Sequence, residues 1–200
     1  KGISNLCRKN TIVSIEFHYI ENLIKRVQFD TIYHEHYSYF SLTAINNLIK
    51  KYKLYLVDAK KITTHGGSMR ILLSKNKGIN KKTENIQKLL VNEKKIGLSK
   101  RHTYFEFQQK TIDKKNDILK KLLLLKQKNK TIAAYGAAAK GNTLINYLGI
   151  KIDTIDFIID KNINKIGRLL PGSRIPIHNE AVLKKKRPDY IIIIPWNLKN

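Results

Sequence analysis

The stretch TIAAYGAAAKGNTLINYLGIKIDTIDFIID, residues 131–160, decides the fold of the last third of the chain. Residues 131–135 and 155–159 are short apolar runs rich in β-branched side chains, which favour buried strands. Between them a glycine-bounded turn, residues 136–141, leads into a helical segment, residues 142–148. The order strand, tight turn, helix and strand, with continuously apolar strands, is typical of a parallel sheet.

A third apolar run, residues 189–194, predicts another strand, so we expect a parallel α/β domain over residues 131–200. The first 75 residues show the order strand, helix, strand, strand, with Ser41 as an N-cap. Residues 76–130 are rich in lysine, asparagine and glutamate and predict a helical connector. The elements expected before the α/β domain are strands at 11–17, 54–59 and 69–74 and helices at 42–52, 83–96 and 101–129.

The chain carries a formal net charge of +24, from 39 basic and 15 acidic residues. A surplus of this size normally indicates nucleic acid or an anionic membrane as the partner. Only seven of the basic residues are arginine, which base-edge readout and phosphate clamps favour, and the 32 lysines are spread along the chain. Lysine, isoleucine and asparagine make up 80 of the 200 residues, as an A/T-rich genome encodes by default. We therefore expect neither a nucleic-acid partner nor a membrane partner.

The chain has no apolar run that approaches the length of a membrane span. Its single cysteine, Cys7, leaves no disulfide and no cysteine-cluster zinc site, and one free thiol fits a reducing compartment. We therefore expect a cytoplasmic protein. Because the chain starts at Lys1 without a leader and ends within an element, at residues 197–200, we also expect a fragment.

The turn YGAAAKGN, residues 135–142, has a position that suits a phosphate, since the N–H groups at a helix start favour an anion. Lys140 would add a positive charge. The turn is neither a Walker A loop nor G-x-G-x-x-G, because Ala138 replaces the second glycine and no Lys-Ser/Thr pair follows. Asp160, 24 residues after Gly136, lies where dinucleotide folds place the acid that binds ribose hydroxyls. The alternatives are a packing turn without a ligand and a solvated strand-end aspartate.

The segment YHEHY, residues 33–37, gathers side chains that exchange protons or donate hydrogen bonds at neutral pH. His34 and His36 would suit a metal pair, but no third ligand follows at a familiar spacing, so no metal site is expected. An aromatic-rich surface loop is the alternative interpretation. His65, beside two glycines, is a weaker candidate, with an ordinary hairpin residue as its alternative.

Five motifs, in order along nearly the whole chain, together resemble the sugar C-methyltransferase family. Its members use S-adenosylmethionine to methylate a ring carbon of a nucleotide-linked keto-deoxysugar. The motifs are FDTIYHEHYSYFSL (29–42), HGGSMR (65–70), YGAAAKGNTLINYLG (135–149), IDFIIDKN with the following K-x-GR-x-x-PGSRIPI (155–177), and PDYIIIIPWNLK (188–199).

The resemblance implies a cysteine-cluster zinc module, a class I methyltransferase domain and a Rossmann-like domain that helps to hold the nucleotide sugar. Residues 1–75 would be the C-terminal half of the methyltransferase domain, with its reversed edge strand. Residues 76–130 would be the connector, and residues 131–200 the Rossmann-like domain. The zinc module would be absent, in agreement with the lone Cys7. The glycine-rich loop for S-adenosylmethionine would be absent too, since no G-x-G-x-G occurs among the ten glycines, so we expect the fragment to be inactive alone.

The resemblance also implies the site residues. His36 would be the general base that removes the proton next to the ketone, and Tyr33 would donate to the enolate oxygen. Glu35 would orient the histidine or a sugar hydroxyl, while His34 has no catalytic role. These roles need convergent side chains, so the segment should be turned and not a flat strand. The substrate, expected to be dTDP-linked, would be held by Gly136, Lys140, Gly141, Asn142 and Asp160.

A second function class stays open at this point. A non-catalytic nucleotide-sugar or dinucleotide-binding module would need only residues 135–160. The YHEHY segment favours the enzyme, because a binding module needs no proton-transfer cluster. The oligomeric state is not encoded in any of these motifs.

The missing glycine-rich loop generates the first testable prediction. The 200-residue chain should not bind S-adenosylmethionine appreciably, because the backbone N–H groups that hold this donor would lie outside it. Isothermal titration calorimetry of the chain with S-adenosylmethionine measures this directly. Micromolar binding would contradict both the prediction and the assignment of residues 1–75.

Overall fold

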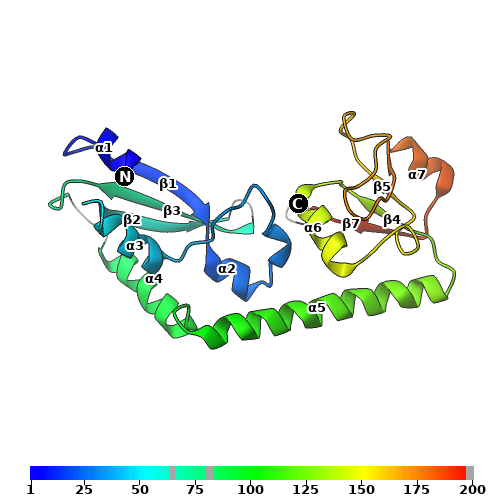
Figure 1. The fold of residues 1–200 in the computed structure, drawn as a ribbon, viewed down its shortest axis with the longest axis horizontal. Helices are drawn as coiled ribbons and strands as arrows, with labels where there is room; N and C mark the ends of the chain where they lie inside the picture. The colour runs from blue at the N-terminus through cyan, green and yellow to red at the C-terminus, as the bar shows by residue number, and fades with distance from the viewer. Residues whose placement is uncertain (64–65, 80–82, 197–200) are drawn as a thin grey trace. The chain divides into compact units, whose positions relative to one another are not determined.

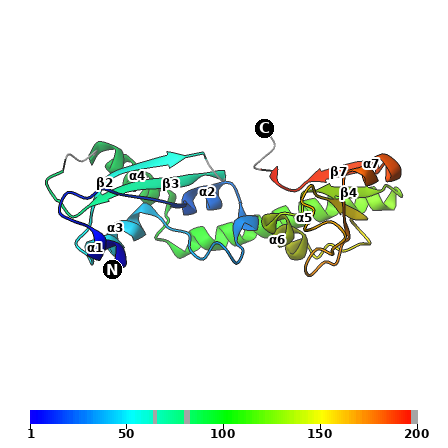
Figure 2. The same cartoon turned by 90° about the horizontal axis from the view of Figure 1, so that it is seen from above.

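A computed structural model describes residues 1–63, 66–79 and 83–196 (Figures 1 and 2). The chain forms two compact units, and each takes two separate stretches of sequence. Unit 1 comprises Lys1–Gln28 and Ser38–Phe107, and unit 2 comprises Phe29–Tyr37 and Gln108–Asn200. The expected α/β class is confirmed, with a parallel and an antiparallel sheet. The three domain ranges stay a prediction, but the short segment Phe29–Tyr37 clusters with unit 2 and not with its sequence neighbours.

Unit 1 contains an antiparallel sheet of the strands β1 (Val13–His18), β2 (Tyr55–Ile62) and β3 (Ser68–Ser74). The sheet order is β1-β3-β2, and β3 runs antiparallel to both neighbours. All the strands predicted for this region are therefore confirmed. The expected edge position of the reversed strand is wrong, because β3 pairs on both sides and lies in the middle of this sheet.

The helices α3 (Leu42–Lys50) and α4 (Thr83–Ile96) pack on this sheet and enclose the core of unit 1 (Figure 1). Alternate residues of β3, Met69, Ile71 and Leu73, are fully buried against them. The predicted N-cap is confirmed, since the Ser41 hydroxyl accepts a hydrogen bond from the N–H of Ala44. The short helices α1 (Gly2–Leu6) and α2 (Ile20–Lys25) were not predicted.

The long helix α5 (Arg101–Gln127) continues from unit 1 into unit 2, and the predicted helical connector is thus observed as α4 and α5. Its last turns carry Ile118, Leu119, Leu122 and Leu125 into the core of unit 2. Within the described ranges, none of the helices combines the length and the apolar character that crossing a bilayer requires.

Unit 2 is built on a parallel sheet of the strands β4 (Ile132–Tyr135), β5 (Phe157–Ile159), β6 (Ile177–His178) and β7 (Tyr190–Ile193), in the order β6-β5-β4-β7. The helix α6 (Ala139–Leu148) and the end of α5 cover one face, and α7 (Ala181–Lys186) covers the other. The 3-10 helix η1 (Phe29–Thr31) packs against α6. The central strands β4 and β5 are covered on both faces and are apolar, as their sequences predict, whereas the edge strand β7 is largely exposed.

The start of α6 lies earlier than predicted, at Ala139 and not at residue 142. Lys140 and Gly141 therefore belong to its first turn. The predicted end is confirmed, since Gly149 is the left-handed C-cap with φ 72°. Small residues let α6 approach the sheet, because a Cβ on Gly141 would meet the side chain of Ile194.

A buried carboxylate in unit 1 makes its stability depend on pH. Glu21 is 2% exposed and accepts hydrogen bonds from Lys25, Lys61 and Asn92. Burial alone would raise its pKa, but these donors outweigh burial and lower the pKa of Glu21 to about 2. A carboxyl group whose pKa falls on folding stabilises the fold above its unfolded pKa of 4.5, and this stabilisation is lost as the pH falls toward 2.

We therefore predict that Glu21→Gln lowers the free energy of unfolding by about 3 kcal/mol at pH 7, following about 1.4 kcal/mol per pKa unit. The difference from the unsubstituted chain should shrink steadily between pH 4.5 and pH 2. Urea unfolding followed by circular dichroism at a series of pH values measures this. Glu84→Gln, which removes an exposed carboxylate that forms a surface ion pair with Lys88, is the control and should show little difference at any pH. A constant difference for Glu21→Gln across the series would contradict the prediction.

Candidate functional site

The segment YHEHY forms a tight turn directly after η1. The carbonyl of Tyr33 accepts a hydrogen bond of 2.9 Å from the N–H of His36. This turn brings the rings of Tyr33 and His36 together, with their centroids 4.2 Å apart. The expectation of a turned segment is confirmed, and both Tyr33 and His36 are half-buried.

The backbone of η1 fixes the tautomer of His36. Its Nδ1 lies 2.8 Å from the carbonyl oxygen of Thr31, which is 2% exposed. A carbonyl can only accept a hydrogen bond, so Nδ1 must carry the hydrogen of the neutral ring. The lone pair that a general base requires is then on Nε2.

The carboxylate of Glu35 lies beside His34 and does not hold the ring nitrogen Nδ1 of His36. The carboxylate lies 3.8 Å from Nε2 of His34, and both side chains are largely exposed. Nδ1 of His36 is held by Thr31 instead, which corrects the expectation that Glu35 orients this ring. Burial, followed by the charge of Glu35, raises the pKa of Tyr33, so Tyr33 stays a protonated phenol at neutral pH and can donate a hydrogen bond.

A pocket of about 390 Å³ lies between this segment and the N-terminus of α6. Tyr33 and His34 line it together with the α6 residues Ala139, Asn142 and Thr143. Ala139, Lys140 and Gly141 form the first helical turn, whose N–H groups have no carbonyl four residues back to bond. The segment between β5 and β6 completes the wall with Asn164, Lys165, Arg168, Leu169, Leu170 and Pro171.

The glycine turn itself is held by protein contacts. The N–H of Gly136 donates to the carbonyl of Ile159, and a Cβ on this residue, at φ 91°, would meet the ring of Pro195. The N–H of Asn142 donates to the carbonyl of Ala138. The backbone N–H groups of Gly136 and Asn142 are therefore already used, which corrects the expectation that they hold an anion.

The two charged residues predicted near this turn also have protein partners. The Lys140 ammonium lies 4.9 Å from the centroid of the Trp196 ring, and burial lowers its pKa while Asp30 opposes the shift. The Asp160 carboxylate accepts from the N–H of Ala137 at 2.7 Å and from Lys165 at 3.4 Å. The side chains of Lys140 and Asp160 therefore both make contacts within the protein around this turn. The ribose contact of Asp160 stays a prediction.

Sequence reasoning missed the residues that complete the site. Thr31 and Asp30 precede the YHEHY segment within its motif, and Lys165 and Arg168 lie in the K-x-GR motif, which received no role. The motifs at 29–42 and 155–177 contain these four residues, so the motifs were the sequence signal that could have identified them as part of the site. His65 lies outside the described residues.

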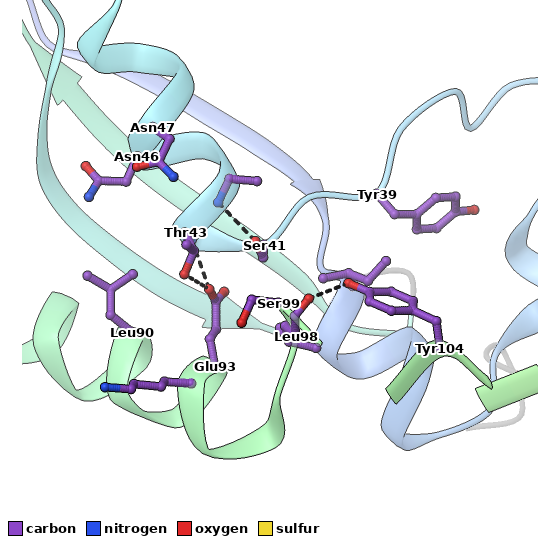
Figure 3. A pocket seen from close by; sticks show the side chains of 13 residues that line it. Tyr39, Ser41, Thr43, Asn46, Asn47, Leu90, Glu93, Leu98, Ser99 and Tyr104 are labelled. Atoms are coloured by element: carbon purple, nitrogen blue, oxygen red, sulfur yellow. Dashed lines mark hydrogen bonds between the residues drawn. The ribbon is translucent and has the colours of Figure 1, made fainter. Parts of the chain in front are cut away.

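A larger cavity, of about 710 Å³, lies in unit 1 and is lined by α3, α4 and the start of α5 (Figure 3). The carboxylate at its wall, Glu93, is 2% exposed and accepts hydrogen bonds from Tyr19, from the N–H of Leu42 and from both the N–H and the hydroxyl of Thr43. Glu93 therefore accepts the backbone N–H groups at the start of α3, in addition to the N-cap Ser41. Among the residues in the described ranges, no group of three histidine, cysteine or acidic side chains is placed to hold a metal ion.

The chain is similar to known proteins over most of its length. Residues 63–200 match the family described as the C-methyltransferase C-terminal domain. The chain is also 33% identical, over 196 residues, to the C-methyltransferase NovU of Streptomyces niveus. This similarity covers 98% of the chain and 47% of that protein, so the chain spans about half the length of this relative.

Proposed function

From the membership of this chain in the C-methyltransferase family, we propose that the protein containing it methylates a ring carbon next to the ketone of a nucleotide-linked keto-deoxysugar. The methyl donor is S-adenosylmethionine and the nucleotide is dTDP, as the sequence motifs imply. The observation that carries the proposal is the turn at residues 33–36. It combines a phenol and an imidazole of defined tautomer in one ring contact, beside a pocket at a helix N-terminus.

The proposed role of His36 is to activate the substrate carbon that receives the methyl group, which is a poor nucleophile. A carbon next to a ketone becomes nucleophilic only when its proton is removed. Nε2 of His36 takes this proton, because Nδ1 is bound to the Thr31 carbonyl. The phenol of Tyr33 donates to the oxygen on which negative charge develops, and the exposed Glu35 binds a sugar hydroxyl.

The donor site is assigned to residues outside this chain. When bound, S-adenosylmethionine supplies an electrophilic methyl group for the carbon nucleophile. The residues of unit 1 do not fit this group, since none of its described turns carries the glycine-rich pattern that a donor of this kind requires. The part played by this chain is therefore proton removal and sugar binding. The zinc module implied by the family motifs is likewise a proposal about the rest of the protein.

The nucleotide diphosphate is proposed to lie at the first turn of α6, opposite Arg168. The helix start favours an anion, and Arg168 lines the same pocket. No hydrogen bond or ion pair within the described ranges engages the guanidinium of Arg168, whereas Lys165 is bound to the Ala137 carbonyl and Lys140 lies on Trp196. Arginine also matches phosphate geometry better than lysine does.

We predict that Arg168→Ala weakens the binding of dTDP by about 1–2 kcal/mol, the amount expected for one charge-assisted contact. Lys140→Ala should weaken it less, and Arg101→Ala, which removes an exposed guanidinium in unit 1, should not change it. Isothermal titration calorimetry with dTDP compares the three variants. A loss in Lys140→Ala alone would return the diphosphate contact to Lys140, as the sequence first indicated.

The proton-removal step is predicted to be measurable without methyl transfer. In the complete protein, the ring C–H of the substrate should exchange with deuterated water even when no methyl donor is present. His36→Asn should reduce exchange and methylation together by about a hundred- to ten-thousand-fold, the usual contribution of a general base. Tyr33→Phe should reduce both by at most about 2.7–4 kcal/mol in activation free energy. Exchange is followed by mass spectrometry or proton NMR.

His34→Asn is the comparison variant: His34 lines the pocket, so the substitution should change KM for the nucleotide sugar, whereas kcat for exchange should stay intact because the base is His36. Loss of exchange in His34→Asn but not in His36→Asn would mean that the base is the other histidine. The second candidate function, a non-catalytic nucleotide-sugar or dinucleotide-binding module, is supported by the pocket at α6 alone. It predicts dTDP binding with no exchange in the unsubstituted protein, or tighter binding of NAD than of a dTDP-linked sugar.

A further inference from the structure

A buried carboxylate lies immediately before the residue that holds His36. Asp30, in η1, is 5% exposed. It accepts a hydrogen bond of 2.6 Å from Nε1 of Trp196, and the positive charge of Lys140 also acts on it. Burial raises the pKa of Asp30, and both partners oppose this shift. A carboxylate so far removed from water is held only where donors and charge compensate it.

The partners of Asp30 come from distant parts of unit 2. Trp196 follows β7, and Lys140 lies in the first turn of α6 with its ammonium over the Trp196 ring. The position of Trp196 is itself restricted, since the preceding Pro195 packs against Gly136 without room for a Cβ. We call Asp30, Lys140 and Trp196 the clamp.

The clamp is coupled to the base through a single backbone step. Asp30 is followed by Thr31, whose carbonyl oxygen lies 2.8 Å from Nδ1 of His36. A rotation of η1 that released the Asp30 carboxylate would also turn this carbonyl. Phe29 supports the same placement, with its ring centroid 5.0 Å from that of Tyr147 on α6.

We propose that Asp30 and Trp196 are positioning residues for His36, acting through the Thr31 carbonyl. This inference rests on the proposed role of His36 as the base. It assigns Lys140 to the clamp, as the partner of a carboxylate, and leaves the diphosphate to the α6 backbone and Arg168. None of the clamp residues needs to contact the substrate.

The kinetic test uses Trp196→Phe and Asp30→Asn in the complete protein. Trp196→Phe keeps an aromatic ring for Lys140 but removes the N–H donor, and Asp30→Asn keeps the shape but removes the charge. Each should lower kcat for deuterium exchange about ten- to a hundred-fold, as small misplacements of a catalytic group do, with KM for the nucleotide sugar changed less than about twofold. Asp113→Asn, an exposed aspartate on α5, is the control and should leave kcat unchanged.

A double-mutant cycle separates positioning from a merely structural role. If Trp196 acts through His36, Trp196→Phe should cause no further loss in a His36→Asn background. Equal fractional losses in both backgrounds, or no loss from either clamp variant alone, would overturn the proposal. Exchange that persists in His36→Asn would instead overturn the proposed function itself, and the positioning role with it.

Fluorescence gives a second test that does not depend on activity. Trp196 is the one tryptophan of the 200-residue chain, so its emission reports on the clamp directly. Asp30→Ala should shift the emission to longer wavelength, because an indole that is no longer held by Asp30 becomes more exposed to water, and Asp113→Asn should not. A melting temperature measured on the same samples shows that the variants are folded. An unchanged emission in folded Asp30→Ala would overturn the clamp.

Discussion

The buried carboxylate of Asp30 is the constraint that joins η1, the start of α6 and the end of β7 in unit 2. A charge in the interior must be met by donors and opposite charge, and here these come from the end of β7 and the start of α6. The segment η1, the start of α6 and the end of β7 are far apart in the sequence but all contact or face the Asp30 carboxylate. The YHEHY turn follows η1 directly, so the position of η1 also fixes the position of the turn.

The same requirement explains why a turn that resembles a phosphate loop is largely occupied by the protein. Gly136 lacks a side chain so that Pro195 can approach, and Gly141 lacks one so that Ile194 can. Asp160 accepts a hydrogen bond from the N–H of the buried Ala137, and Lys165 donates one to the carbonyl of the same residue. The first turn of α6 is the part of this region whose N–H groups have no carbonyl four residues back to bond.

Local sequence was enough to predict most of the fold. The continuous apolar runs predict β4, β5 and β7, the amphipathic stripe predicts α5, and Gly149 marks the end of α6. The two-residue strand β6 and the six-residue helices α2 and α7 are too short for an apolar pattern to repeat, so the sequence carried no signal for them. The start of α6 was misplaced because alanine at an N-cap gives no capping signal.

The sequence predicts those features of the site that depend only on neighbouring residues in the chain. Proton-transfer residue types and a turn are visible in YHEHY itself. The partner of His36 is a backbone carbonyl, which no residue type announces. The grouping of Phe29–Tyr37 with residues after 107 rests on Trp196 and Tyr147, more than a hundred positions away. Periodicity and motif spacing do not report contacts at that separation.

Unit 2 is built from two separate stretches of the chain, Phe29–Tyr37 and Gln108–Asn200, and the ribosome synthesises these stretches at different times. Asp30 and Trp196 are separated by 166 positions. At about 5–20 residues per second, a ribosome needs roughly 8 to 33 s to reach the second partner after the first. During that interval unit 1 can close around its sheet while η1 still lacks its indole partner. The turn that carries His36 is therefore fixed in place only after Trp196 has been synthesised.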